Sequence, residues 1–261
     1  MSLTKNGSTN LATRLRGLLA VSGLSLKGLM NPKGLMGLML VFSFHASADL
    51  EEGIYAKHEG RYGVALTDFE PLVNLGYAPA QYELGEMYEH GLGVKKDLKK
   101  ASELYHLAAK QGNAEAQFSV STFYAQGITV EKSAKTAAMW ARKSAQMGLA
   151  AAQFNVAIMY ENGEGVNMDT KKAFYWYTQA AEQNYILAQY NLALMYSQGS
   201  GTKKSVFLSY VWNTIAGQNG YKDAVKSRSL DARELSVQDL KMTRYKIEEL
   251  LRKIETKRTD L

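Results

Sequence analysis

The side chains best suited to chemistry in this sequence are one close pair of carboxylates and three of its four histidines. Glu161 and Glu164 lie three residues apart, a spacing at which two carboxylates can act as general acid and base in hydrolysis. His58, His90 and His106 belong to no H-E-x-x-H pair, and the chain has no cysteine, so we expect no metal site. Carboxylates at the end of a helix are usually only solvated. We therefore expect no catalytic residue and no enzymatic activity.

Glycine pairs are the second motif with a chemical meaning, because glycine-rich loops can hold phosphate groups. They are Gly91-Leu92-Gly93, Gly163-Glu164-Gly165 and Gly199-Ser200-Gly201. None is followed by the Gly-Lys-Ser/Thr of a phosphate-binding loop, and they recur at multiples of one interval. We interpret them as turns and expect no cofactor.

That interval of 36 residues organises the chain from residue 77 to residue 220. An Ala-Gln pair recurs at Ala80-Gln81, Ala116-Gln117, Ala152-Gln153 and Ala188-Gln189. A tyrosine follows at Tyr88, Tyr124, Tyr160 and Tyr196, and a glycine three residues later at Gly91, Gly127, Gly163 and Gly199. Self-similarity at this period is typical of a solenoid.

Each unit reads as two antiparallel helices. Apolar residues at Ala80, Leu84 and Met87 share one side of a helix, which we expect to end at the left-handed glycine Gly91. The second helix is expected to begin at an N-cap residue, and to end at a residue type that tolerates a positive φ. The expected N-caps are Asp97, Ser133, Asp169 and Ser205, and the expected ends are Gly112, Gly148, Asn184 and Gly220.

The motif A-Q-Y-x-L-G-x-M-Y-x-x-G-x-G-V-x-x-D from Ala80 to Asp97 resembles the Sel1-like repeat family. Four units fit, at residues 77–112, 113–148, 149–184 and 185–220. The resemblance implies an all-α fold, a right-handed α/α superhelical solenoid used mainly for protein–protein interaction. The second unit departs at Thr129, where the others carry glycine, so we expect that turn to be built differently.

The repeats are flanked by divergent segments. Residues 49–76 are expected to form a helix pair, and residues 221–235 a half repeat carrying Ala224. Ser236 and Asp239 then start a charged helix with an apolar stripe, Leu240, Ile247, Leu250, Leu251 and Ile254. The last unit of a solenoid needs a cover, so we interpret this C-terminal helix as a cap. The alternative is a dimerising or docking helix.

Residues 1–48 are typical of a secretory signal peptide. They hold five positive charges, no acidic residue and an apolar run from Leu35 to Phe44, followed by Ala46-Ser47-Ala48. We expect cleavage after Ala48 and a periplasmic or secreted protein. A start at Met30 would give a more compact leader, with residues 1–29 untranslated. An uncleaved inner-membrane anchor is the alternative, although the run is shorter than the roughly 20 residues that span a bilayer.

Loss of the leader changes what the charge implies. The chain has 31 positive and 25 negative residues, and removing five positive ones leaves 26 against 25. The mature protein would then be nearly neutral, so we expect no nucleic-acid partner. We also expect no stable membrane insertion after signal cleavage.

Positions that vary between repeats are free to recognise a partner. On the first helix of each unit these are one aromatic column, Tyr82, Phe118, Phe154 and Tyr190, and one variable column, Glu86, Thr122, Ile158 and Leu194. Resemblance to tetratricopeptide-type solenoids implies that first helices line a concave face. We interpret the two columns as a groove for a protein or peptide, although the rings could equally serve packing.

The sequence thus predicts an exported adaptor that binds a partner protein without catalysis. One alternative is an envelope scaffold for peptidoglycan or exopolysaccharide machinery, in which a glycan is the ligand. A hydrolase such as a β-lactamase-like enzyme, using Glu161 or His90, is the other.

Overall fold

The computed structural model describes residues 46–259, and every regular element within them is a helix. The expected leader lies outside the described residues except for residues 46–48, which are helical. The chain forms two compact units that divide between Asn113 and Ala114. Among the described helices, none is both long and apolar enough to cross a membrane.

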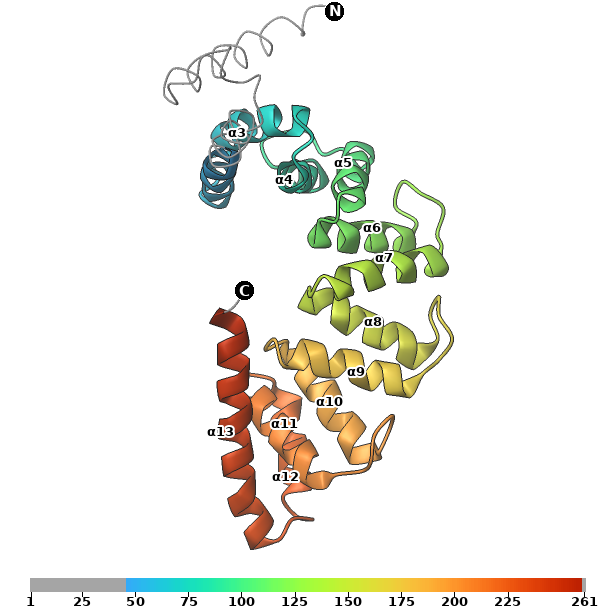
Figure 1. Cartoon of the computed structure of the whole chain (residues 1–261), viewed down its shortest axis with the longest axis vertical. Helices are drawn as coiled ribbons and strands as arrows, with labels where there is room; N and C mark the ends of the chain where they lie inside the picture. The colour runs from blue at the N-terminus through green and yellow to red at the C-terminus, as the bar shows by residue number, and fades with distance from the viewer. Residues whose placement is uncertain (1–45, 260–261) are drawn as a thin grey trace, which may run out of the picture. The chain divides into compact units, whose positions relative to one another are not determined.

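The first unit contains the helical segment 46–58 and three further helices. These are α3 (Tyr62–Asn74), α4 (Ala78–His90) and α5 (Leu98–Lys110). Helix α4 packs between α3 and α5 (Figure 1). The fully buried Phe69 and Met87 lie in the core of this unit with Leu84 and Leu104. The segment before the repeats therefore shares one apolar interior with the first repeat.

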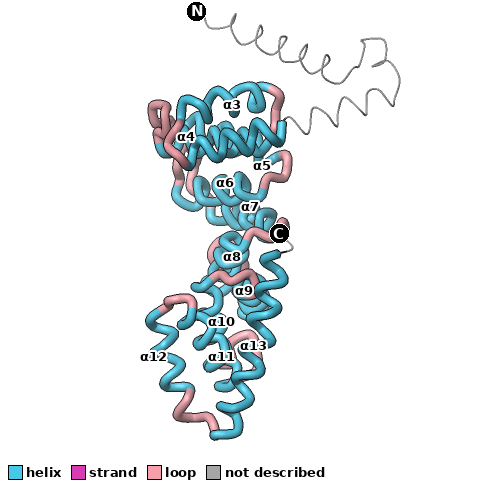
Figure 2. The backbone as a smooth tube through the Cα atoms, turned by 90° about the vertical axis from the view of Figure 1, so that its left-hand side faces the viewer, coloured by secondary structure: helices cyan, strands magenta, loops and turns pink. Residues whose placement is uncertain are grey.

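The second unit continues the same helix-pair pattern. Its helices are α6 (Ala114–Gln126), α7 (Ala134–Gln146), α8 (Ala150–Asn162), α9 (Thr170–Ala181), α10 (Ile186–Gln198), α11 (Val206–Gln218), α12 (Lys222–Asp231) and α13 (Val237–Thr259). From α6 to α12 each helix packs against the next one along the chain (Figure 2). The expected all-α solenoid of helix pairs is confirmed.

The helix boundaries follow the expected capping residues. Ser133 and Ser205 each accept a hydrogen bond from the backbone N–H three residues later, at 3.2 Å, and Asp97 and Asp169 do so at 3.0 Å. Each second helix is followed by a residue with positive φ, at Gly112, Gly148, Asn184 and Gly220. Local sequence therefore sets where each helix begins and ends.

The turn of the second repeat corrects one expectation. Thr129 adopts φ +60°, close to the +71° of Gly165 and the +69° of Gly201, so this turn is built in the same way as the others. A β-branched residue is strained in that conformation, at roughly 1–3 kcal/mol. Glycine is required at Gly165 for a second reason, since a Cβ there would lie 2.1 Å from the carbonyl oxygen of Ala134.

The glutamine of each Ala-Gln pair is buried, and in the first, third and fourth repeats it forms hydrogen bonds between helices. Gln183 donates to Gln153 Oε1 at 2.7 Å, and Gln111 donates to Gln81 Oε1 at 2.8 Å. Gln153 in turn donates to the carbonyl of Ala145 at 3.2 Å. A buried amide needs such partners, which explains why this glutamine recurs in every repeat.

Helix α13, the predicted cap, packs on the last complete repeat through α11. It starts at a capping box, in which Asp239 N–H donates to Ser236 Oγ at 3.0 Å and Ser236 N–H donates to Asp239 at 3.2 Å. Leu250 and Ile254 are buried in the core of the second unit, and α13 packs on α11 (Figure 1). Leu251, also in the predicted stripe, is 37% exposed.

Candidate partner-binding surface

The predicted binding residues lie on the first helices of the four repeats, α4, α6, α8 and α10. Their aromatic column is half-buried throughout, at Tyr82, Phe118, Phe154 and Tyr190. The variable column runs from half-buried Glu86, Thr122 and Ile158 to exposed Leu194. Neighbouring groups decide what each position can still bind, and the two units differ in this respect.

In the first unit, Glu86 already holds a cation. Lys57, from the helical segment 46–58, places its Nζ 2.7 Å from Glu86 Oε2 and also contacts Glu83. Burial acts to lower the pKa of Lys57, but its two carboxylate partners outweigh burial and raise that pKa. Tyr82 donates to Glu86 Oε1 at 2.8 Å, so both carboxylate oxygens are engaged. Sequence comparison between repeats missed Lys57 because it precedes the first repeat.

In the second unit, several predicted residues serve packing. The ring of Phe154 lies 5.7 Å from that of Tyr177 and 5.0 Å from that of Tyr185. Ile158 and Phe118 pack against the same apolar core. Thr122 donates to the carbonyl of Phe118 at 3.2 Å, one turn back on its own helix. Each of these side chains is thus partly used by the fold.

Tyr190 and Leu194 come together at a cavity of about 200 Å³ between α10, α11 and α12. Leu194 is 41% exposed, and the ring of Tyr190 lies 4.8 Å from that of Tyr221. Ser209, Asn213 and Asp231 also line the cavity and are buried. The sequence pattern located the two apolar residues but missed the polar ones, which lie outside the first helices.

The two carboxylates of the sequence pair have different hydrogen-bond partners. Glu161 accepts a hydrogen bond from the Tyr177 hydroxyl at 2.7 Å, whereas Glu164 accepts one from Asn162 at 3.1 Å. Burial, and then the hydrogen bond to Glu161, raise the pKa of Tyr177 far above its ordinary value. His58 and His90 are exposed, and the described residues contain no group of three histidine or acidic side chains that could hold a metal.

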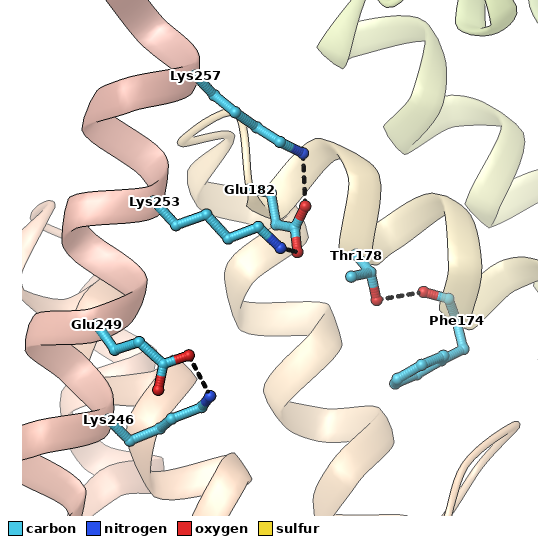
Figure 3. A network of polar contacts seen from close by, with 7 residues as sticks. All are labelled: Phe174, Thr178, Glu182, Lys246, Glu249, Lys253 and Lys257. Atoms are coloured by element: carbon cyan, nitrogen blue, oxygen red, sulfur yellow. Dashed lines mark hydrogen bonds and ion pairs between the residues drawn. The ribbon is translucent and has the colours of Figure 1, made fainter.

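Glu182 is a buried carboxylate whose ion pairs the sequence did not reveal. It lies at the end of α9 and is 9% exposed. Lys253 and Lys257 of α13 each place Nζ 2.5 Å from one of its oxygens (Figure 3). Burial acts to raise the pKa of Glu182, but the two lysines outweigh it and hold that pKa below its usual value. This ionic clasp joins the cap to the third repeat.

Comparison with known proteins agrees with the repeat pattern. The family model of the Sel1 repeat matches residues 78–113, 114–149, 150–185 and 186–221. The crystal structure of c5321, a protective antigen of uropathogenic Escherichia coli strains displaying an SLR fold, matches with a TM-score of 0.71 and 26% identity. That match covers 85% of this chain and 50% of c5321, so the chain spans half the length of that relative.

A Sel1 repeat protein from Oxalobacter formigenes shares the fold, with a TM-score of 0.66 and 23% identity over 86% of this chain and 92% of that one. A comparison with curated proteins found no match. The four tandem matches cover more than half of the sequence and coincide with the helix pairs of the structure. This chain belongs to the Sel1 repeat family.

Proposed function

We propose that the protein is a non-catalytic scaffold that binds a partner polypeptide on its fourth repeat. Sel1 repeats generally mediate protein–protein interaction, which makes partner binding the expected role. The observation that carries the proposal is the cavity between α10 and α12, where Leu194 and Leu230 are 41% and 59% exposed. Apolar side chains at the rim of a cavity can anchor a peptide by burying its side chains.

A cross-linked pull-down with the full chain tests this proposal. The parent is compared with a Leu194→Ser/Leu230→Ser variant and with a matched control, Met168→Ser, which removes another apolar side chain that is 70% exposed. We expect one defined protein to be captured by the parent and the control and lost from the double variant, with unchanged helicity. Capture of the same protein by all three would contradict the proposed surface.

We also propose export, with cleavage after Ala48, because of the basic and apolar composition of the leader. Cleavage there would remove Ala46, which is 4% exposed and packs with Leu72 and Ala80, together with two further residues of the helical segment 46–58. The N-terminal sequence and intact mass of the protein from fractionated cells test it. A mature chain starting at Asp49 in the periplasm or medium is expected, and an intact leader in the membrane fraction would favour the anchor instead.

A further inference from the structure

The cavity between α10, α11 and α12 lies where the fourth repeat departs from the repeat pattern. In the third repeat, Tyr177 fills the equivalent space and donates to Glu161. The first repeat has the same pair, with Tyr105 donating to Glu89 at 2.6 Å. In the fourth repeat, Asn213 stands at the tyrosine position. Ser197 replaces the glutamate, and Ser209 replaces an alanine that the three other repeats share, at Ala101, Ala137 and Ala173. These three substitutions meet in one cavity.

A buried carboxylate also lines this cavity. Asp231, the last residue of α12, is 9% exposed, and its Oδ2 accepts from Ser209 Oγ at 2.8 Å and from Asn213 Nδ2 at 2.9 Å. Within residues 46–259, Asp231 forms no ion pair, and no lysine or arginine lines the cavity. Burying a carboxylate without a cation is unfavourable, so this site would be stabilised by a cationic ligand.

The environment of Asn213 points to the same kind of ligand. Asn213 is 2% exposed, and with its amide nitrogen donating to Asp231, its Oδ1 is buried without a hydrogen-bond partner among the described residues. A buried acceptor that lacks a donor costs about 1–3 kcal/mol. The cavity therefore combines a carboxylate that has no cationic partner with a neighbouring unsatisfied acceptor, and a cation that donates hydrogen bonds would satisfy the carboxylate.

We propose that this cavity receives a lysine or arginine side chain of the partner. This inference rests on the proposed function and specifies the chemistry of the ligand. The volume of about 200 Å³ is suited to one long side chain. Its charged end would meet Asp231, while its methylene groups would contact Leu194 and Leu230, and the ring of Tyr190 offers a face for the cation. One carboxylate is too few for a calcium ion, which takes six to eight oxygen ligands.

The test is titration of the ¹⁵N-labelled full chain with N-acetyl-lysine methylamide and N-acetyl-arginine methylamide, followed through the side-chain amide signals of Asn213. N-acetyl-norleucine methylamide, which is apolar and uncharged, is the matched control probe. We expect saturable shifts with at least one cationic probe and about tenfold weaker binding of norleucine. Equal binding of norleucine, or no shift with either cationic probe, would overturn the proposal.

Two variants distinguish the effect of the charge of Asp231 from that of another carboxylate nearby. Asp231→Asn keeps the shape of the site and is expected to weaken the cationic probe about tenfold. Glu234→Gln removes an exposed carboxylate three residues away and is expected to leave binding unchanged. Equal binding by Asp231→Asn and the parent overturns the site. Should Asp231→Asn lose helicity, Tyr190→Leu is the second test, with an expected weakening of about threefold.

Failure of the basic-side-chain site can be distinguished from failure of the proposed scaffold function. If the pull-down captures a protein through Leu194 and Leu230 but no cationic probe binds, the scaffold stands and the basic-side-chain site is wrong. If a cationic probe binds in an Asp231-dependent way but no protein is captured, the cavity is a cation site and the scaffold proposal is wrong.

Discussion

The third and fourth repeats have the same helix-pair backbone, but different side chains fill the space between the helices. In the third repeat, Tyr177 is fully buried between α8 and α9 and its hydroxyl is bound to Glu161. In the fourth, the shorter Asn213 leaves a cavity, and the carboxylate of Asp231 enters from α12. The same repeat position thus holds a packing side chain in the third repeat and borders a cavity in the fourth. In the fourth repeat, a departure from the repeat at a packing position therefore coincides with a candidate site.

The largest effect is expected from opening the third repeat. Tyr177→Ala removes a fully buried ring and leaves a cavity, so we expect a loss of about 3–5 kcal/mol in the free energy of unfolding, measured by urea denaturation followed by circular dichroism. Tyr177→Phe keeps the ring and removes only the hydrogen bond to Glu161, with an expected loss of about 1 kcal/mol. Similar losses for both variants would show that the hydrogen bond, rather than packing, stabilises this repeat.

The reverse experiment closes the fourth repeat. Ser197→Glu with Asn213→Tyr copies the Glu161–Tyr177 pair into the cavity. Because Asp231 already occupies part of that space, we expect overpacking to cost about 1–3 kcal/mol and binding of the cationic probe to be lost. Glu234→Gln, an exposed position outside the cavity lining, serves as the control and should retain binding. Retained binding in the double variant would place the cation elsewhere.

Much of this scaffold was predictable because local chemistry repeats four times. The N-caps at Ser133 and Ser205 and the left-handed Gly91 and Gly163 are where the pattern placed them. Thr129 was the exception, since propensity disfavours its conformation and the repeated turn geometry overrides that preference. Fold and boundaries therefore followed from spacing and capping residues.

The candidate site was only half predictable. Tyr190 and Leu194 could be found by comparing repeats on the first helix, but Asp231 comes from a half repeat that has no complete counterpart to compare with. Lys57 and the lysines that bind Glu182 also come from outside the repeats. Contacts between repeated and unrepeated segments carry no periodic signal, so only the structure brings them together.

A smaller effect concerns how the third repeat holds the cap. Glu182→Gln keeps the shape of the side chain but removes the charge that binds Lys253 and Lys257. The carboxylate is buried while the lysines reach solvent, so we expect a loss of about 1–2 kcal/mol at neutral pH, measured by urea denaturation. Glu248→Gln, on the exposed face of α13, is the control and should change stability little.

The same clasp should make stability depend on acid pH. The pKa of Glu182 is lower in the folded chain than the usual 4.5, so its contribution is fully present above that value and is lost as pH falls through the folded pKa. The difference in unfolding free energy between the parent and Glu182→Gln should therefore be constant at neutral pH and shrink as the pH falls below the usual 4.5. A difference that does not shrink as the pH falls would mean that the carboxylate charge does not hold the cap.

The smallest effect is expected from the N-cap of α11, because the third and fourth repeats share this capping position. Ser205→Ala removes the hydroxyl that accepts from the N–H of Leu208 at 3.2 Å, and we expect a loss of about 1 kcal/mol. Ser205→Asp, which copies the third repeat's Asp169, should retain the cap and most of the stability. Thermal unfolding of the two variants and titration with the cationic probe give the comparison. If Ser205→Ala also weakened the probe about tenfold, the cavity would depend on the start of α11, and the site could not be treated as separable from the scaffold that carries it.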